Sequence, residues 1–201
     1  MRVSPEELLE RYGTTYATEA GITLRDKPAA LFQLLVLAQL SSRPIAASVA
    51  AASTHELLRA GWRTPERMRD STWQERVDAL GRGGYRRYDE STARDLDTLA
   101  GQLQTEHRGD LRRLRPDDRD GVPALESALQ GFQRIGPTGA AIFCREVQAV
   151  WPAVRPYFDD KARSAAGDIG YPTDADDLAG LVEPDQVAAF SSALVRWSLE
   201  R

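Results

Sequence analysis

Two adjacent carboxylates, Asp159 and Asp160, stand where a helix is expected to begin. A carboxylate at a helix N-terminus stays ionised, because the helix dipole favours negative charge there. An ionised carboxylate can stabilise a sugar cation and orient an attacking water molecule, which is the chemistry of glycosidic bond hydrolysis. Aspartates at helix starts also serve as ordinary caps, so both roles stay open for this pair.

A second segment of chemical interest is the turn in LQGFQRIGPTGAA, residues 129–141. An apolar helix is expected to end near Gly131, and another begins directly after Gly136. Ile135 can fix the turn in the core, while Gly136 lets a ligand approach the backbone closely. The first amides of the second helix have no helical partners and suit a phosphate. The pattern predicts a helix-hairpin-helix, although an ordinary helix–helix corner has similar local features.

The basic residues are nearly all arginines, since only Lys27 and Lys161 among the 26 Lys and Arg are lysines. Arginine binds phosphate through a bidentate fork that lysine lacks. The formal net charge of −4 nevertheless argues against bulk attraction to nucleic acid. Binding to DNA would therefore depend on where the arginines lie.

Capping signals and apolar periodicity predict helices almost throughout the chain, and no segment alternates like a strand. Helices are expected over 5–11, 28–40, 45–60, a short stretch from 65, 71–81, 89–106, 122–131, 138–150 and 158–168, with a short and a longer helix after 174. Residues 13–26 are expected to form a polar connection, and 107–121 an exposed loop. The fold class is therefore all-α, one unit of two helical lobes. Residues 30–135, with most of the hairpin, form the central lobe, and 1–29 plus 152–201 form the second.

Several functional classes are excluded by composition. The longest apolar stretch, residues 34–40, is too short to cross a membrane. The acidic start MRVSPEELLE does not resemble a signal peptide, so we expect a cytoplasmic, nucleoid-associated protein. A single cysteine, Cys144, excludes a cysteine-ligated iron–sulfur cluster, and two distant histidines make a histidine-based zinc site improbable. No metal is expected.

The segments resemble, in order along the chain, the helix-hairpin-helix DNA glycosylases of the endonuclease III-like superfamily. LFQLLVLAQLSSRPIAASVAA at 31–51 is similar to the first core helix of that family and the turn after it. GRGGYRRY at 81–88 is similar to its glycine-aromatic loop, 129–141 to its hairpin, and VWPAVRPYFDDKARSAAGDIGYP at 150–172 to the segment with its catalytic aspartate. The resemblance covers residues 28–172 and implies a base-excision-repair enzyme acting on double-stranded DNA with a flipped base.

The resemblance also implies roles for particular residues. Counting back from the helix end at Ile169–Gly170 places the catalytic aspartate at Asp159, with Asp160 as the alternative. The expected DNA contacts are Arg134, Ile135, Gly136, Thr138 and Gly139 in the hairpin, Arg43 after the first core helix, and Tyr85, Arg86 and Arg87 in the glycine-aromatic loop. Tyr85 would act as a wedge or stacking side chain. Trp151 and Tyr157 are the candidates for the base pocket.

The departures from the family pattern define the expected activity. Bifunctional members carry a lysine two residues after the second hairpin glycine, where this chain has Thr138, and a hydroxyl cannot form the required imine. Arg134 replaces the first hairpin glycine, and the family's four-cysteine cluster loop is impossible here. We therefore expect a monofunctional glycosylase without lyase activity or cofactor. A monovalent cation at the hairpin turn is compatible with the resemblance. The alternative is a DNA-binding or damage-sensing relative that has lost catalysis.

Overall fold

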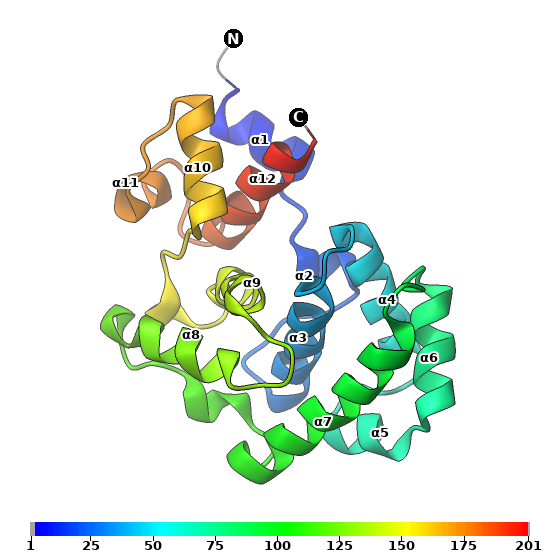
Figure 1. Ribbon diagram of the computed structural model, residues 1–201. Coiled ribbons are helices and arrows are strands. Elements are labelled where there is room, and N and C mark those ends of the chain that lie inside the picture. Colours follow the sequence, from blue (N-terminus) through cyan, green and yellow to red (C-terminus); the bar gives the residue numbers. More distant parts are fainter. Residues whose placement is uncertain (1–2, 201) are drawn as a thin grey trace.

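The computed structural model describes residues 3–200, and all regular secondary structure in this range is helical (Figure 1). The all-α prediction is confirmed. The α-helices are α1 (Pro5–Tyr12), α2 (Tyr16–Glu19), α3 (Pro28–Ser41), α4 (Ala47–Arg59), α5 (Pro65–Asp70), α6 (Trp73–Arg82), α7 (Asp89–His107), α8 (Val122–Gln130), α9 (Pro137–Val147), α10 (Asp160–Ile169), α11 (Ala175–Ala179) and α12 (Val187–Leu199). Short 3-10 turns cover Leu111–Leu114, Arg119–Gly121 and Pro152–Val154.

Local chemistry explains most of these boundaries. Reciprocal capping boxes begin α1, through Ser4 and Glu7, and α6, through Thr72 and Glu75. Proline occupies the first turn of α3, α5, α8 and α9, where its missing N–H costs no helical hydrogen bond. These signals are encoded within a few residues of each helix start, so the sequence alone locates them.

Helix α3 is the central element, because residues 30–40 are all buried. It packs against both α4 and α9. The contact with α9 is close: a Cβ added at Gly139 would lie 2.2 Å from Ser42 Oγ and 3.1 Å from the Ala38 carbonyl oxygen. Gly139 therefore lets the second hairpin helix pack directly on the central helix.

The buried apolar residues form two separate cores. One runs from Tyr16 to Val154 and contains α3, and the other joins Leu8 to residues between Phe158 and Val195. Figure 1 shows α1, α10 and α12 together at the end that carries both termini, with α9 between them and the α3–α7 group. The candidate site is built where these two groups of helices meet.

The segment before α3 departs from the expected polar connection. It contains the one-turn helix α2, whose Tyr16 and Ala17 are buried in the first core rather than in the lobe of α1. The side chain of Glu146, on α9, accepts hydrogen bonds from the backbone amides of Tyr16 at 3.3 Å and Ala17 at 2.9 Å. This cap lies 129 residues away along the chain, so no local signal could indicate it.

Two further observations apply to residues 3–200. No helix in this range combines the length and apolar character needed to span a membrane. No group of three or more His, Cys, Asp or Glu side chains in the same range is arranged to hold a metal ion.

Candidate functional site

The hairpin joins α8 to α9 through a turn fixed by two apolar side chains. Phe132 and Ile135 are 3% and 4% exposed, so Ile135 fixes the turn in the core as expected. Arg134 adopts φ +61°, a left-handed conformation that is ordinarily left to glycine. Glycine would adopt this backbone geometry without the steric cost that a side chain brings.

Gly136 is the N-cap of α9 and supplies no side chain to its amides. Its φ of −97° suits any residue, and a Cβ there would meet no atom within 4 Å. The space at the Gly136 Cβ position is therefore open, and the amides of Thr138 and Gly139 donate to no acceptor among the described residues. A helix N-terminus with amides in this state attracts anions.

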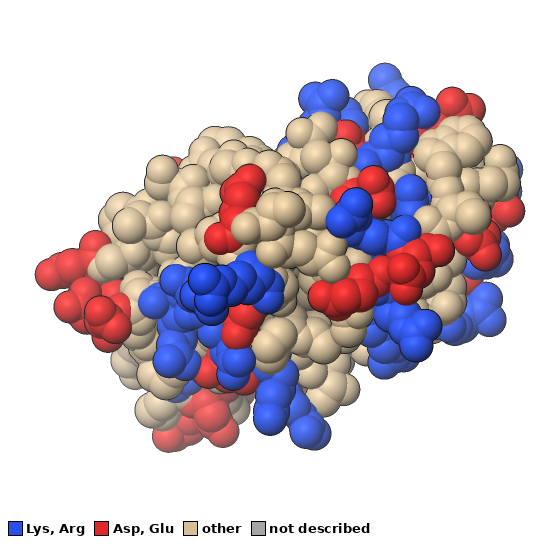
Figure 2. Space-filling view, turned by 90° about the horizontal axis from the view of Figure 1, so that it is seen from below, with Lys and Arg blue, Asp and Glu red and all other residues tan. Residues whose placement is uncertain are grey.

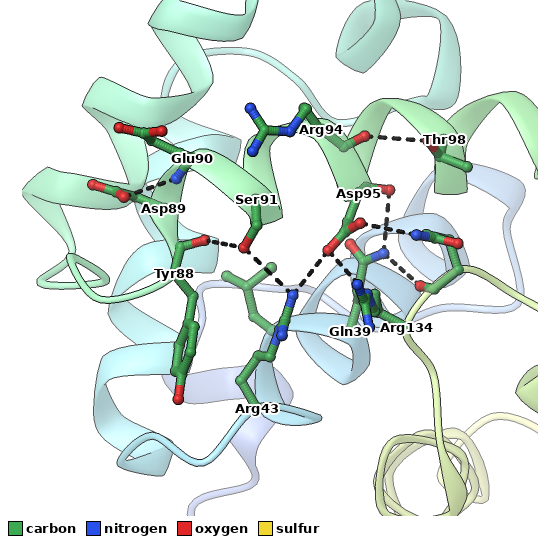
Figure 3. A network of polar contacts seen from close by, with 12 residues as sticks. Gln39, Arg43, Tyr88, Asp89, Glu90, Ser91, Arg94, Asp95, Thr98 and Arg134 are labelled. Atoms are coloured by element: carbon green, nitrogen blue, oxygen red, sulfur yellow. Dashed lines mark hydrogen bonds and ion pairs between the residues drawn. The ribbon is translucent and has the colours of Figure 1, made fainter.

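A buried carboxylate organises the charges beside the hairpin (Figure 3). Asp95 on α7 accepts a hydrogen bond from Arg43 at 3.1 Å and another from the Gln133 side chain at 2.9 Å, and Arg134 Nε lies 3.6 Å from the same carboxylate. Arg43 also lies over the Tyr88 ring at 5.1 Å. Asp95 therefore positions two of the expected DNA-contacting arginines, and Arg134 keeps the more exposed side chain of the two.

A cavity of about 730 Å³ opens beside the hairpin and brings together residues from seven helices, α2, α3, α4, α8, α9, α10 and α12. Its lining includes Thr138 of α9, Glu126 of α8, Tyr16 of α2 and Asp159 at the start of α10. Thr138 and Asp159 are 21 positions apart in the sequence, yet they face one space. The hairpin and the carboxylate segment therefore form a single site.

Asp159 is held on two sides. It is the N-cap of α10, and its Oδ1 accepts the Ala162 amide at 2.8 Å. Its Oδ2 lies 2.6 Å from Nη1 of Arg145 on α9. The Asp159 side chain is 12% exposed and that of Arg145 only 3%. Asp160 differs sharply, because its side chain is fully exposed and pairs with Arg163 at 3.1 Å. Asp159 is therefore the fixed and largely buried carboxylate of the two.

Arg145 is itself enclosed by aromatic and charged groups. Its guanidinium lies over the Tyr16 ring at 5.4 Å, and Arg196 lies over the same ring at 4.1 Å. Burial raises the pKa of the Tyr16 hydroxyl. Arg145 Nε has no hydrogen-bond partner among the described residues. The cation beside Asp159 is therefore fixed mainly by packing and by Asp159 itself.

A second polar pair, Tyr157 and Glu126, also lines the cavity. Tyr157 donates its hydroxyl to Glu126 Oε1 at 2.5 Å. Gln148 holds the Tyr157 backbone, because its side chain donates to the Tyr157 carbonyl and accepts from the Tyr157 amide, each at 2.8 Å. Desolvation by burial raises the pKa of Tyr157, so its hydroxyl remains the donor. Tyr157 lines the cavity, as expected of a base-pocket residue.

Two aromatic side chains lie elsewhere than expected. Tyr85 is 1% exposed and donates its hydroxyl to the Leu40 carbonyl at 3.0 Å, so it is a core residue and cannot act as a wedge in this conformation. Trp151 is fully buried, donates to Asp26 at 2.9 Å and packs edge-on against Phe143. Trp151 does not line the cavity. Both corrections have one cause, since each polar atom finds a partner inside the protein.

The remaining expected DNA contacts divide by exposure. Arg86, Arg87, Arg134 and Thr138 are exposed, whereas Ile135 and Gly139 are buried. Figure 2 shows basic and acidic side chains interspersed on the face seen from below, without one continuous basic surface. Any attraction to a phosphate backbone must therefore come from local groups of arginines.

The hairpin turn offers few free oxygens to a cation. The backbone carbonyls of Gly131, Phe132 and Gln133 each accept a hydrogen bond from a protein N–H, the first and third from the side chains of Gln102 and Gln39. A monovalent cation that used these three oxygens would share them with protein donors.

Comparison with known proteins relates this arrangement to the fold of a solved structure. No family model matches the sequence, and no curated protein sequence is significantly similar to it. A solved structure described as a trapped endonuclease III–DNA covalent intermediate, an estranged-adenine complex, superposes with a TM-score of 0.51 at 15% identity. The match covers 98% of this chain and 83% of that one. The chain has an endonuclease III-like fold.

Three cavity residues, Glu126, Arg145 and Tyr16, were not expected from the sequence. Arg145 and Glu146 are the two charged residues in the otherwise apolar segment AAIFCREV. A charged side chain in an apolar helix is a local sign that it has a partner inside the protein. Glu126 and Tyr16 carry no comparable sign. Their contacts join positions 31 and 130 residues apart along the chain.

Proposed function

We propose that this protein is a DNA glycosylase that hydrolyses the N-glycosidic bond of a damaged or mispaired base in double-stranded DNA. The observation that carries the proposal is the cavity shared by Thr138, which directly follows the hairpin, and the α10 cap Asp159. The endonuclease III-like fold supports it, since the solved relative holds DNA. The flipped nucleotide would enter this cavity while the hairpin contacts the backbone.

Asp159 supplies the catalytic charge in this proposal. Departure of the base leaves positive charge on the deoxyribose, which a carboxylate stabilises while it orients the attacking water. The Ala162 amide and Arg145 hold the carboxylate in one position, so little reorganisation is needed at the moment of reaction. Arg145 also offsets part of the negative charge of Asp159. The carboxylate is therefore held in a fixed position, but it stabilises a sugar cation less than an unpaired carboxylate would.

Lyase chemistry is outside the proposed function. A hydroxyl at position 138 cannot form an imine with the opened sugar. Lys161 also lines the cavity, and its exposed amine is the one other candidate there. Glycosidic bond hydrolysis needs no amine, and the release of free base with an intact strand is the expected reaction.

DNA would be bound at the hairpin through its backbone. The open amides at Thr138 and Gly139 suit one phosphate, and the exposed Arg134 beside them suits another. Arg86 and Arg87 extend the basic side chains of the glycine-rich loop. Contacts of this kind fix the position of the duplex without reading its sequence.

One observation favours a second candidate function, a DNA-binding or damage-sensing protein without catalysis. The pairing of Asp159 with Arg145 at 2.6 Å reduces the charge that remains for a sugar cation. A protein that only recognises lesions would keep the hairpin and the cavity without needing that charge. In this reading Asp159 serves as a helix cap and ion-pair partner alone.

The deciding experiment is release of free base from defined duplexes. The protein is incubated with duplexes containing uracil, hypoxanthine, alkylated purines or oxidised bases, and released bases are quantified beside the Asp159→Asn variant. Base release that depends on Asp159 supports the glycosylase. Tight lesion binding without release from any duplex supports the second candidate, and absence of both overturns the proposal.

A further inference from the structure

Glu126 is the one carboxylate lining the cavity that forms no ion pair among the described residues. Asp159 is paired with Arg145, and Asp160 with Arg163. Glu126 is partly buried and accepts only the Tyr157 hydroxyl, through Oε1. Its second oxygen faces no described donor. A partly desolvated charge in this state favours a ligand that brings positive charge or N–H donors to it.

The position of Glu126 is fixed from behind. Tyr157 donates to it at 2.5 Å, and the Gln148 side chain, which is fully buried, clamps the Tyr157 backbone on both its N–H and its carbonyl. A hydrogen-bond acceptor that is held in one position discriminates between ligands better than a mobile one. The carboxylate therefore presents a fixed negative charge to whatever enters the cavity.

The cavity lining also carries a charge of the opposite sign. Lys161 is exposed, lines the same cavity, and forms no ion pair among residues 3–200. A nucleotide fits these two unpaired charges if its phosphate faces Lys161 and its base faces Glu126. The base would then lie against the carboxylate and the Tyr157 ring.

From these contacts we infer that Glu126 is a specificity-determining residue and that the preferred substrates are cationic, N-alkylated purines. The inference rests on the proposed glycosylase function. Alkylation at a purine ring nitrogen places a positive charge on the base, which the Glu126 carboxylate would attract. A neutral base gains only hydrogen bonds from the same group.

The state of Asp159 points independently to the same substrates. Because Arg145 offsets its charge, Asp159 gives limited stabilisation to the sugar cation. A cationic purine needs less help: water adds to C1′, the C1′–N bond breaks, the base leaves as a neutral molecule, and the proton of the water passes to solvent. A neutral base would leave as an anion and would require an acid as well.

The test compares release of a cationic base, 7-methylguanine, with release of a neutral one, hypoxanthine, after subtraction of spontaneous loss. The wild type should release 7-methylguanine about tenfold faster or more, and Glu126→Gln should lower that ratio about tenfold. Glutamine keeps the size and an oxygen for Tyr157, and thermal unfolding checks that the variant folds. Glu10→Gln, an exposed site on α1, is the matched control for loss of one charge.

Tyr157→Phe separates charge from structure. This variant removes the hydroxyl donor but keeps the Glu126 charge, so the preference for the cationic base should remain. Equal release of both bases by the wild type, or equal loss of preference in Tyr157→Phe and Glu126→Gln, would overturn the inference. Binding of the wild-type protein to a duplex with an abasic analogue separates failure of this inference from failure of the proposed function. If the wild type shows no binding to that duplex and releases no base, the proposed function itself is overturned.

Discussion

Arg145 Nη1 on α9 lies 2.6 Å from Asp159 Oδ2 at the start of α10, and both side chains are largely withdrawn from solvent. The two residues belong to different parts of the molecule. The neighbours of Arg145 on α9, Cys144 and Val147, are in the core that contains α3, whereas α10 packs in the core with α12. The ion pair therefore joins the two cores at the candidate catalytic position.

Asp159→Asn should abolish most base excision. Asparagine can still accept the Ala162 amide, but it supplies no negative charge and leaves the Arg145 cation unopposed beside the sugar, so release should fall on the order of a hundredfold or more. Asp160→Asn is the control, because Asp160 is fully exposed and should change release little. The comparison is made by single-turnover base release. Loss of activity in Asp160→Asn alone would move the catalytic role to that residue.

The stability of the same variant tests the ion pair. The helix-cap role alone would predict a loss under about 1 kcal/mol for asparagine. Because Arg145 would remain buried without its partner, Asp159→Asn should instead lower the free energy of unfolding by about 3 kcal/mol. The double variant with Arg145→Met should lose less than the sum of the single losses, by about 1 kcal/mol or more. Additive losses in chemical denaturation would show that the pair contributes nothing.

Gly136→Val and Gly139→Ala should have opposite effects. Gly136 has open space at its Cβ position, so valine should leave thermal stability nearly unchanged and weaken DNA binding equally across sequences. Gly139→Ala would place a Cβ against Ser42 and the Ala38 carbonyl, and it should destabilise the protein by about 1–3 kcal/mol. Fluorescence anisotropy and thermal unfolding measure the two effects. Unchanged DNA affinity in Gly136→Val would remove the hairpin from the binding surface.

Borohydride should trap no covalent complex between this protein and an abasic-site duplex. The residue two positions after Gly136 is Thr138 rather than a lysine, and a hydroxyl forms no reducible imine. The gel-shift assay for trapped species is run beside Lys161→Arg, which keeps the charge and removes the nucleophilic amine. Trapping that disappears in Lys161→Arg would mean that this cavity lysine is a nucleophile.

Alkaline pH should destabilise the protein through Tyr85. Burial raises the pKa of this hydroxyl from 10.0 to about 12, because the charged phenolate is disfavoured in the core. Folding favours the neutral hydroxyl of Tyr85. Its contribution to the free energy of unfolding is therefore complete below pH 10 and is lost as the pH rises toward 12. Tyr85→Phe should cost about 1 kcal/mol at pH 8, for the lost bond to Leu40.

The difference between wild type and Tyr85→Phe is the measured quantity, since burial also raises the pKa of Tyr16 and Tyr157. Denaturant unfolding from pH 8 to pH 12 should show that difference shrinking above pH 10. A constant difference across this range would mean that Tyr85 ionises without penalty and is more accessible than its 1% exposure indicates.

The sequence by itself determined the fold class, most helix positions and the hairpin. These features depend on local chemistry: capping boxes at Ser4 and Thr72, proline in first turns, and the strongly apolar segment 28–40, which predicted a helix. The family resemblance pointed to Asp159, and the structure places that residue at the N-cap of α10. The same approach missed α2, whose cap comes from Glu146 in a distant helix.

Only the tertiary structure decided which side chains share the site. Tyr85 and Trp151 looked available for DNA, yet each finds an internal hydrogen-bond partner and lies in the core. The Arg145–Asp159 and Tyr157–Glu126 contacts join segments whose distance in space the sequence does not encode locally. The environment of a side chain is set by every element packed around it. A polar group that forms a hydrogen bond inside the protein is not available for contacts at the surface. The charges left unpaired in the cavity could therefore be identified only after the helices had been assembled.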